Sequence, residues 1–226
     1  DAKLAKTIAD LTALTRKMRA WRKEEEEFLE LATEEIRVIC DEGGENVERI
    51  QRRPQREADQ LVEECMLAGN VAVAQELITR GIAGLYRVHD EPDPEKLVEF
   101  SVFLEETFAM TPGDLSSRAA CNHFLHGLPD DQRKPVIMDA FLRSLPRAHY
   151  LEKNALHFGL GKGVYCNFTS PIRRYPDLVV HQQLWAADHA AAARPYRQRD
   201  RDECAKLALT TSERERNNDE AYYAAT

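Results

Sequence analysis

The chain has 226 residues, of which 43% are hydrophobic and 31% are charged, and its formal net charge is −8 at pH 7. This composition is typical of a globular protein that can bury an ample core, and no apolar run approaches the length that spans a membrane. The net negative charge also argues against a protein that coats nucleic acid without specificity.

The N-terminal part is expected to hold a helix and a hairpin. Apolar residues recur every three or four positions over residues 4–20, which predicts an amphipathic helix. The charge run RKEEEE at 22–27 favours a solvated helix end over a metal site built from adjacent glutamates. Two short runs around a Gly-Gly pair predict a β-hairpin over residues 36–50.

The segment 56–80 gives the strongest helical pattern of the chain. Its clearest apolar stripe contains Leu61, Cys65, Ala68 and Ala72. Residues spaced by three and four positions share one face of a helix, so this stripe is the predicted buried face.

The remainder of the chain is also expected to be mainly helical. Residues 84–97 predict a loop that leads into a helix near Pro94, and residues 155–168 predict a loop or a short strand. The further helices are expected over residues 94–108, 115–126, 131–145, 171–187 and 197–224. The predicted fold class is therefore α+β, mostly α-helical, with a small β-hairpin component.

The ends and the cysteines indicate a piece of a longer cytoplasmic protein. The sequence begins at Asp1 inside an apparent helix and ends in a helical segment without a cap, so we expect residues 1–226 to be a single fragment. The cysteines are odd in number and form no CxxC motif, which indicates a reducing compartment and no structural zinc. They are Cys40, Cys65, Cys121, Cys166 and Cys204.

The segment FTSPIRRYPDL at residues 168–178 places two arginines where a helix is expected to begin. Serine is a favoured N-cap and proline a favoured first helical residue, so Ser170 is predicted to cap a helix that starts at Pro171. Arg173 and Arg174 then fall in the first turn, whose free N–H groups and positive dipole prefer a negative charge. The pattern therefore requires an anion nearby.

Either a phosphate or an acidic side chain can supply that anion. A phosphate would contact both arginines and the free N–H groups together. Asp177 lies four residues after Arg173 and three after Arg174, so an internal ion pair fits the spacing equally well, although one carboxylate satisfies only one arginine well. The surrounding residues 140–176 contain six Lys or Arg and a single acidic residue, which fits either an anion site or chance clustering.

Other candidate side chains carry weaker signals. Glu63 and Glu64 lie in an otherwise apolar helix, so one of them is expected to be partly buried, either in an ion pair or facing a cleft. His123 and His126 share a helix face without further metal ligands in sequence, which favours a partly exposed surface over a metal pair. The sequence has no P-loop, GxGxxG or GxSxG motif.

Four blocks together resemble the RNase II/RNase R family of exoribonucleases. They are HFGLGKGVYCNFTSPIRRYPDLVVH at 157–181, LVEECMLAGNVAVA at 61–74, LYRVHDEPDPEKL at 85–97 and ERERNNDEA at 213–221. Their order and approximate spacing are those of the family, and they extend over nearly the whole chain. The resemblance implies the C-terminal half of an RNB-type catalytic domain.

The resemblance also assigns roles to particular residues. It implies that Arg173 contacts the scissile phosphate at the floor of a channel for single-stranded RNA. Glu63 would lie near the terminal ribose, and Glu215 would line the same pocket. Arg174 and Thr169 are expected to bind RNA as well, with Arg174 either assisting Arg173 or pairing with Asp177.

The family acts by Mg²⁺-assisted phosphodiester hydrolysis, so the resemblance implies a processive 3′-to-5′ exoribonuclease that releases nucleoside 5′-monophosphates. No aspartate-rich metal motif, cold-shock domain or S1 domain is found in this sequence. We therefore expect the chain to hold no metal, to be inactive alone, to pack against a missing N-terminal half and to self-associate through exposed apolar surface.

Two alternatives to an exoribonuclease remain open. They are a non-catalytic RNA-binding relative and a helical scaffold whose arginines only pair with acids.

Overall fold

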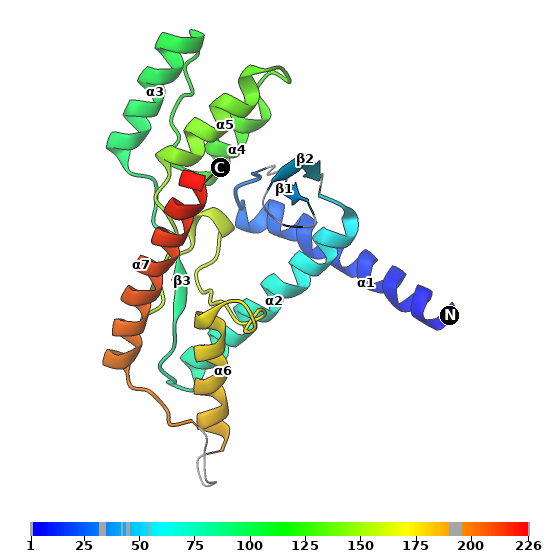
Figure 1. Cartoon of the computed structure of the whole chain (residues 1–226), viewed down its shortest axis with the longest axis vertical. Helices are drawn as coiled ribbons and strands as arrows, with labels where there is room; N and C mark the ends of the chain where they lie inside the picture. The colour runs from blue at the N-terminus through cyan, green and yellow to red at the C-terminus, as the bar shows by residue number, and fades with distance from the viewer. Residues whose placement is uncertain are drawn as a thin grey trace. The chain divides into compact units, whose positions relative to one another are not determined.

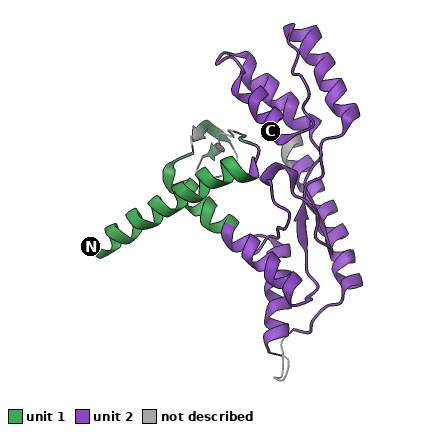
Figure 2. Ribbon diagram, turned by 180° about the vertical axis from the view of Figure 1, so that it is seen from behind, with its two compact units in different colours: residues 1–25, 30–67 green, residues 26–29, 68–226 purple. Residues whose placement is uncertain are grey.

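A computed structural model describes residues 2–31, 35–41, 43, 46–53, 55–189 and 196–225. The described chain is mostly helical with a few short strands, which confirms the predicted α+β class. It forms two compact units, shown in Figure 2. Unit 1 contains residues 1–25 and 30–67, and unit 2 contains residues 26–29 and 68–226.

Unit 1 contains a long helix, a hairpin and the first part of a second helix. Helix α1 spans Ala2–Trp21, and helix α2 spans Glu57–Thr79 and continues into unit 2 (Figure 1). Strands β1 (Glu35–Cys40) and β2 (Val47–Arg53) pair antiparallel, with a register shift between Ile39 and Cys40. The predicted hairpin is therefore confirmed.

The predicted apolar stripe of α1 is a helix face but not a buried one. Leu4, Ile8, Leu14 and Trp21 are each more than half exposed. The buried residues are Thr15 of α1 and Arg22 of the following π-helical turn (Arg22–Glu26). Arginine side chains of this part of the chain form ion pairs with glutamates of α2. The prediction that this charge run is solvated is therefore wrong for Arg22, which is buried in an ion pair with α2. Residues 23–25 are exposed.

The buried face of α2 also differs from the prediction. Cys65, Ala68 and Ala72 are exposed. The buried positions are Glu64, Leu67, Asn70, Ala74 and Leu77. The apolar pattern misleads here because Glu64 and Asn70 are polar yet lie inside, where each makes hydrogen bonds that compensate its burial.

Unit 2 contains the remaining elements. They are β3 (Tyr86–Val88), α3 (Pro94–Phe108), α4 (Arg118–His126), α5 (Arg133–Ser144), β4 (His149–Leu151), a 3₁₀ turn (Phe158–Leu160), α6 (Tyr175–Asp188) and α7 (Arg201–Ala225). Asp93 accepts a hydrogen bond from the Glu95 N–H and thereby caps α3, with Pro94 in its first turn. The predicted helices are confirmed within a few residues, and the largest deviations are the starts of α6 and α7, which lie later than predicted.

A second small sheet was not predicted. Strands β3 and β4 pair antiparallel, with Tyr86 opposite Leu151 and Val88 opposite His149. Each strand has three residues, too few to show a period-two pattern in the sequence. Helices α3, α4 and α5 are inserted between these paired strands and share a cluster of Phe100, Phe124 and Phe141.

The core of unit 2 forms where α2, α6 and α7 meet this sheet. Helix α7 packs on β4 and α6. One buried cluster contains Ala74, Leu77, Ile82, Tyr86, Val88, Cys166 and Val180. A second contains Leu85, Tyr150, Val179, Cys204 and Ala208. Both clusters include residues of α6, so the start of that helix is fixed to the core.

Candidate functional site

The arginine segment forms a turn before α6 rather than its first turn. The N–H groups of Arg173 and Arg174 donate to the Ser170 carbonyl at 3.3 and 3.1 Å, and α6 begins only at Tyr175. Arg174 occupies the N-cap position, with φ −124° and ψ 117°, and Pro176 lies in the first turn. The prediction that Ser170 caps a helix starting at Pro171 is therefore wrong. Two prolines could each begin a helix, and the sequence signal selected the earlier one.

Asp177 determines the shape of this turn. Its side chain is 0% exposed. Its Oδ1 atom accepts hydrogen bonds from the Ser170 N–H and from Nη2 of Arg174, both at 2.8 Å. The carboxylate therefore pairs with Arg174, which resolves the alternative that the spacing left open.

Arg173 remains exposed, and within the described part of the chain it makes no ion pair or side-chain hydrogen bond. It lines a cleft of about 590 Å³ together with Arg174, Tyr150 and one face of α7. The α7 residues of this cleft are Leu207, Thr210, Thr211, Arg214, Glu215, Asn218 and Asp219. Two of the predicted site residues, Arg173 and Glu215, thus line one cavity, although 42 positions separate them in the sequence.

The acidic residues of this cleft are already neutralised. Arg87 donates a hydrogen bond to Glu215, and Arg147 lies 3.9 Å from Asp219. Arg214, like Arg173, makes no ion pair among the described residues. The cleft therefore presents unpaired positive charge, which suits a phosphate.

A second cleft of about 570 Å³ continues this basic surface. It is lined by Arg87, Arg147, His149 and Arg216, and it shares Glu215 and Asp219 with the first cleft. The guanidinium of Arg87 lies 4.5 Å from the ring centre of Tyr150, a favourable cation–π contact. Burial raises the pKa of the Tyr150 phenol, which keeps it protonated, and its oxygen accepts a hydrogen bond from Asn167.

The glutamate pair of α2 belongs to unit 1. Glu64 is only 1% exposed and accepts a hydrogen bond from Arg22 at 2.6 Å, with Arg19 at 3.4 Å. Glu63 is 40% exposed, accepts a hydrogen bond from Gln55 and lies 3.6 Å from Arg19. The partly buried carboxylate that the sequence predicted is therefore Glu64, and its role is an ion pair.

The remaining predicted residues give no metal site. The hydroxyl oxygen of Thr169 is buried without a hydrogen-bond partner among the described residues. His123 and His126 are exposed on α4. The described part of the chain contains no group of three or more His, Cys, Asp or Glu side chains that could hold a metal ion. No helix among the described residues is long and apolar enough to span a membrane.

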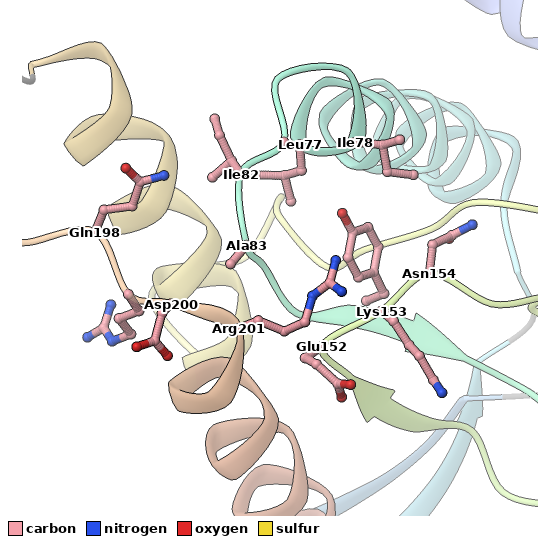
Figure 3. Close-up of a pocket in the computed structure, with 13 residues that line it drawn as sticks. Leu77, Ile78, Ile82, Ala83, Glu152, Lys153, Asn154, Gln198, Asp200 and Arg201 are labelled. Carbon is pink, nitrogen blue, oxygen red and sulfur yellow. The ribbon is translucent and has the colours of Figure 1, made fainter.

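A third cleft, of about 740 Å³, contains none of the predicted site residues. It lies between the end of α2 and the first turn of α7, and Arg201 extends from α7 between Ala83 and Glu152 (Figure 3). Size alone therefore does not distinguish these clefts, and the first is distinguished by Arg173, which makes no ion pair among the described residues.

The fold is mostly helical, and one of its clefts is lined by arginines. The chain matches the RNB domain over residues 1–189, and it belongs to the RNB-domain family of RNase II and RNase R. This match confirms the resemblance found in the sequence.

Named relatives agree with this assignment. Ribonuclease R of Thermotoga maritima is 34% identical over 186 residues, which are 78% of this chain and 25% of that protein. Two structures of Mycoplasma genitalium RNase R, one with ribose-methylated single-stranded RNA and one with double-stranded RNA, are 26% identical. They align with 95% of this chain and with 34% and 39% of their own chains, at TM-scores of 0.81 and 0.82.

The chain spans about a quarter of the length of the first of these relatives. Yeast Ssd1, described as a pseudonuclease, is 22% identical over 70% of this chain and 20% of its own, with a TM-score of 0.54. That likeness concerns the fold alone.

Proposed function

We propose that this chain is part of a processive 3′-to-5′ exoribonuclease that hydrolyses single-stranded RNA to nucleoside 5′-monophosphates. The observation that carries the proposal is Arg173, exposed in a basic cleft and unpaired among the described residues, while Asp177 engages its neighbour Arg174. The family supplies the reaction class, and M. genitalium RNase R has been captured with RNA.

Arg173 binds the scissile phosphate in this proposal. Its guanidinium offers a planar pair of donors to two phosphate oxygens and stabilises the charge that develops there. Arg174 holds the turn through Asp177, and it also lines the cleft. Arg173 can bind the phosphate because no carboxylate among the described residues forms an ion pair with it.

Glu215 orients the end nucleotide in this proposal. Arg87 donates a hydrogen bond to its carboxylate and so fixes the orientation of that group at the wall of the cleft. The carboxylate oxygens can still accept further hydrogen bonds there. A ribose hydroxyl is the matching donor. The contacts of Glu63 and Thr169 with RNA rest on the family resemblance and remain part of the proposal.

The described residues do not fit a Mg²⁺ site, so no step is assigned to the metal from this chain. We propose that residues of the parent protein outside the described part hold Mg²⁺, which would activate the nucleophile and neutralise the phosphate there. The compartment we propose is the cytoplasm, in keeping with five cysteines that form no disulfide.

A non-catalytic RNA-binding protein is the second candidate. Its support is that the yeast pseudonuclease Ssd1 shares the fold. Both candidates require RNA in the Arg173 cleft, and they differ only in cleavage.

Degradation of a 5′-labelled RNA by the intact parent protein tests the proposal. We expect the full-length labelled strand to be converted to a short labelled end product without accumulated intermediates, nucleoside 5′-monophosphates as products, and loss of cleavage in Arg173→Ala. Arg143→Ala is the matched control, because Arg143 is an exposed arginine that pairs with Asp139 on α5. RNA binding without cleavage would favour the second candidate, and the absence of both would leave only a scaffold role.

A further inference from the structure

The loop that leads to Arg173 is fastened to the middle of α2 through the side chain of Asn70. This asparagine is 1% exposed. Its Oδ1 atom accepts hydrogen bonds from the N–H groups of Phe168 at 3.0 Å and Thr169 at 3.2 Å. Its Nδ2 atom donates to the Tyr165 hydroxyl at 2.8 Å. All of these residues belong to unit 2.

The same loop is held at other points along its length. Asn167 donates to the Tyr150 hydroxyl at 2.7 Å, and the His181 ring hydrogen-bonds the Phe168 carbonyl at 2.9 Å while stacking on the Phe168 ring. At the end of the loop, the N–H of Ser170 donates a hydrogen bond to the carboxylate of Asp177. Backbone and side chains from Tyr165 to Ser170 are thus tied to α2, β4 and α6.

Within this network, Asn70 is the side chain that accepts hydrogen bonds from two consecutive backbone N–H groups, those of Phe168 and Thr169, directly before Ser170. Two consecutive N–H groups that point to one buried acceptor have a single matching geometry, so the acceptor fixes the direction in which the chain enters the turn. An alanine would leave both partly buried N–H groups without this acceptor, and the loop would have to move for them to reach water. Small displacements of a charge-stabilising group reduce catalysis more than they reduce binding.

We propose that Asn70 is a positioning residue that sets Arg173 against the scissile phosphate by holding the Phe168 and Thr169 N–H groups. The inference rests on the proposed function, since it assigns the residue that preorganises the same site. Asn70 itself does not line the Arg173 cleft, so it acts through the loop and not on the RNA.

Three variants of the intact protein separate the two ends of the amide. Asn70→Ala removes both the acceptor and the donor. Asn70→Asp keeps an oxygen for the two N–H groups, and the Tyr165 hydroxyl can then donate to the other oxygen. Tyr165→Phe removes only the hydroxyl partner. Gln75→Ala is the control, because Gln75 is exposed on the same helix.

Single-turnover cleavage of a short RNA is the first measurement. We expect the cleavage rate of Asn70→Ala to fall about a hundredfold with little change in KM, as for loss of one well-placed stabilising group. Asn70→Asp should recover most of the rate, and Tyr165→Phe and Gln75→Ala should stay within a few-fold of wild type. Wild-type cleavage by folded Asn70→Ala would overturn the inference. If Asn70→Ala does not fold, a slow but folded Asn70→Asp would overturn it equally.

A double-mutant cycle with Arg173→Ala provides a readout that a merely structural role would not move. Asn70→Ala should add little to the loss already caused by Arg173→Ala, because both act through one guanidinium. Independent, additive losses would overturn the inference. If the parent protein binds RNA without cleaving it, the same cycle read as RNA affinity still decides on Asn70, while the absence of cleavage refutes the exonuclease proposal separately.

Discussion

Arg174 donates to the fully buried carboxylate of Asp177 at 2.8 Å, and this ion pair leaves Arg173 as the exposed member of the arginine pair. Arg173 makes no ion pair among the described residues, although Oδ2 of Asp177 has no hydrogen-bond partner there. The two adjacent arginines therefore have different roles. Arg174 stabilises the turn, and Arg173 is available to a phosphate in the cleft.

Arg173→Lys in the intact protein should lower kcat about a hundred- to a thousandfold with little effect on KM, because an ammonium cannot present two parallel donors to the phosphate. RNA affinity should change less, with a salt slope flatter by only about 0.7. Single-turnover kinetics and a melting curve measure both effects. A variant that melts early but cleaves at the wild-type rate would give Arg173 a structural role only.

Asp177→Asn should destabilise unit 2, since it removes the charge that faces Arg174 in a site with no exposed carboxylate surface. We expect a loss of about 2–4 kcal/mol in the free energy of unfolding, measured by denaturant titration. Asp188→Asn is a matched control, because Asp188 forms an exposed ion pair with Arg80 and its removal should have little effect. Equal effects of the two substitutions would contradict the role assigned to Asp177.

The 226-residue chain by itself should not shorten RNA, because its described residues include no group of three or more His, Cys, Asp or Glu side chains that could hold a metal ion. Incubation of the purified chain with a 3′-tailed RNA and Mg²⁺, followed by gel analysis, checks this. The prediction fails if magnesium-dependent shortening occurs and is abolished by Arg173→Ala.

The isolated chain should self-associate through α1. Leu4, Ile8 and Leu14 are exposed on this helix, and large exposed apolar patches are uncommon on monomers. Sedimentation analysis should show concentration-dependent association that is reduced in Ile8→Glu/Leu14→Glu. Lys17→Glu, at an exposed polar position of the same helix, should leave association unchanged. A monomer at all concentrations would refute the prediction.

Stability should fall as the pH decreases below about 6.5, in part because of His157. Burial, reinforced by His89 and Arg87, lowers the pKa of His157 to about 3. The unfolded chain binds a proton near pH 6.5 while the folded chain does not, so protonation of His157 favours the unfolded state. The free energy of unfolding is therefore highest above about pH 6.5 and falls as the pH decreases toward 3. The slope from this residue is at most about 1.4 kcal/mol per pH unit.

Denaturant titrations between pH 7.5 and 5.0 measure this slope. His157→Gln should flatten it, because glutamine does not titrate, whatever the substitution does to stability at pH 7.5. The burial argument would be refuted by a variant whose slope equals that of the wild type.

Local sequence signals were sufficient for most of the helices and for the hairpin. Pro94 predicted the start of α3 correctly, because a first-turn proline acts within a few residues, and the structure adds Asp93 as the cap. The adjacent arginines indicated that an anion lies nearby, and for Arg174 that anion is Asp177, whereas a phosphate at Arg173 stays a prediction. The family resemblance of the same segment agreed with this interpretation, and the RNB match supports membership.

Only the tertiary structure decided which side chains fill each role. Glu64 rather than Glu63 is buried because Arg22, 42 positions away, reaches it, and no periodicity encodes that contact. Arg173 rather than Arg174 is free for a ligand because Asp177 bonds to Ser170 and thereby folds the segment into a turn that brings Arg174 alone to the carboxylate. Helix propensity and capping act over one or two turns, whereas these choices depend on residues far apart in sequence that packing brings together.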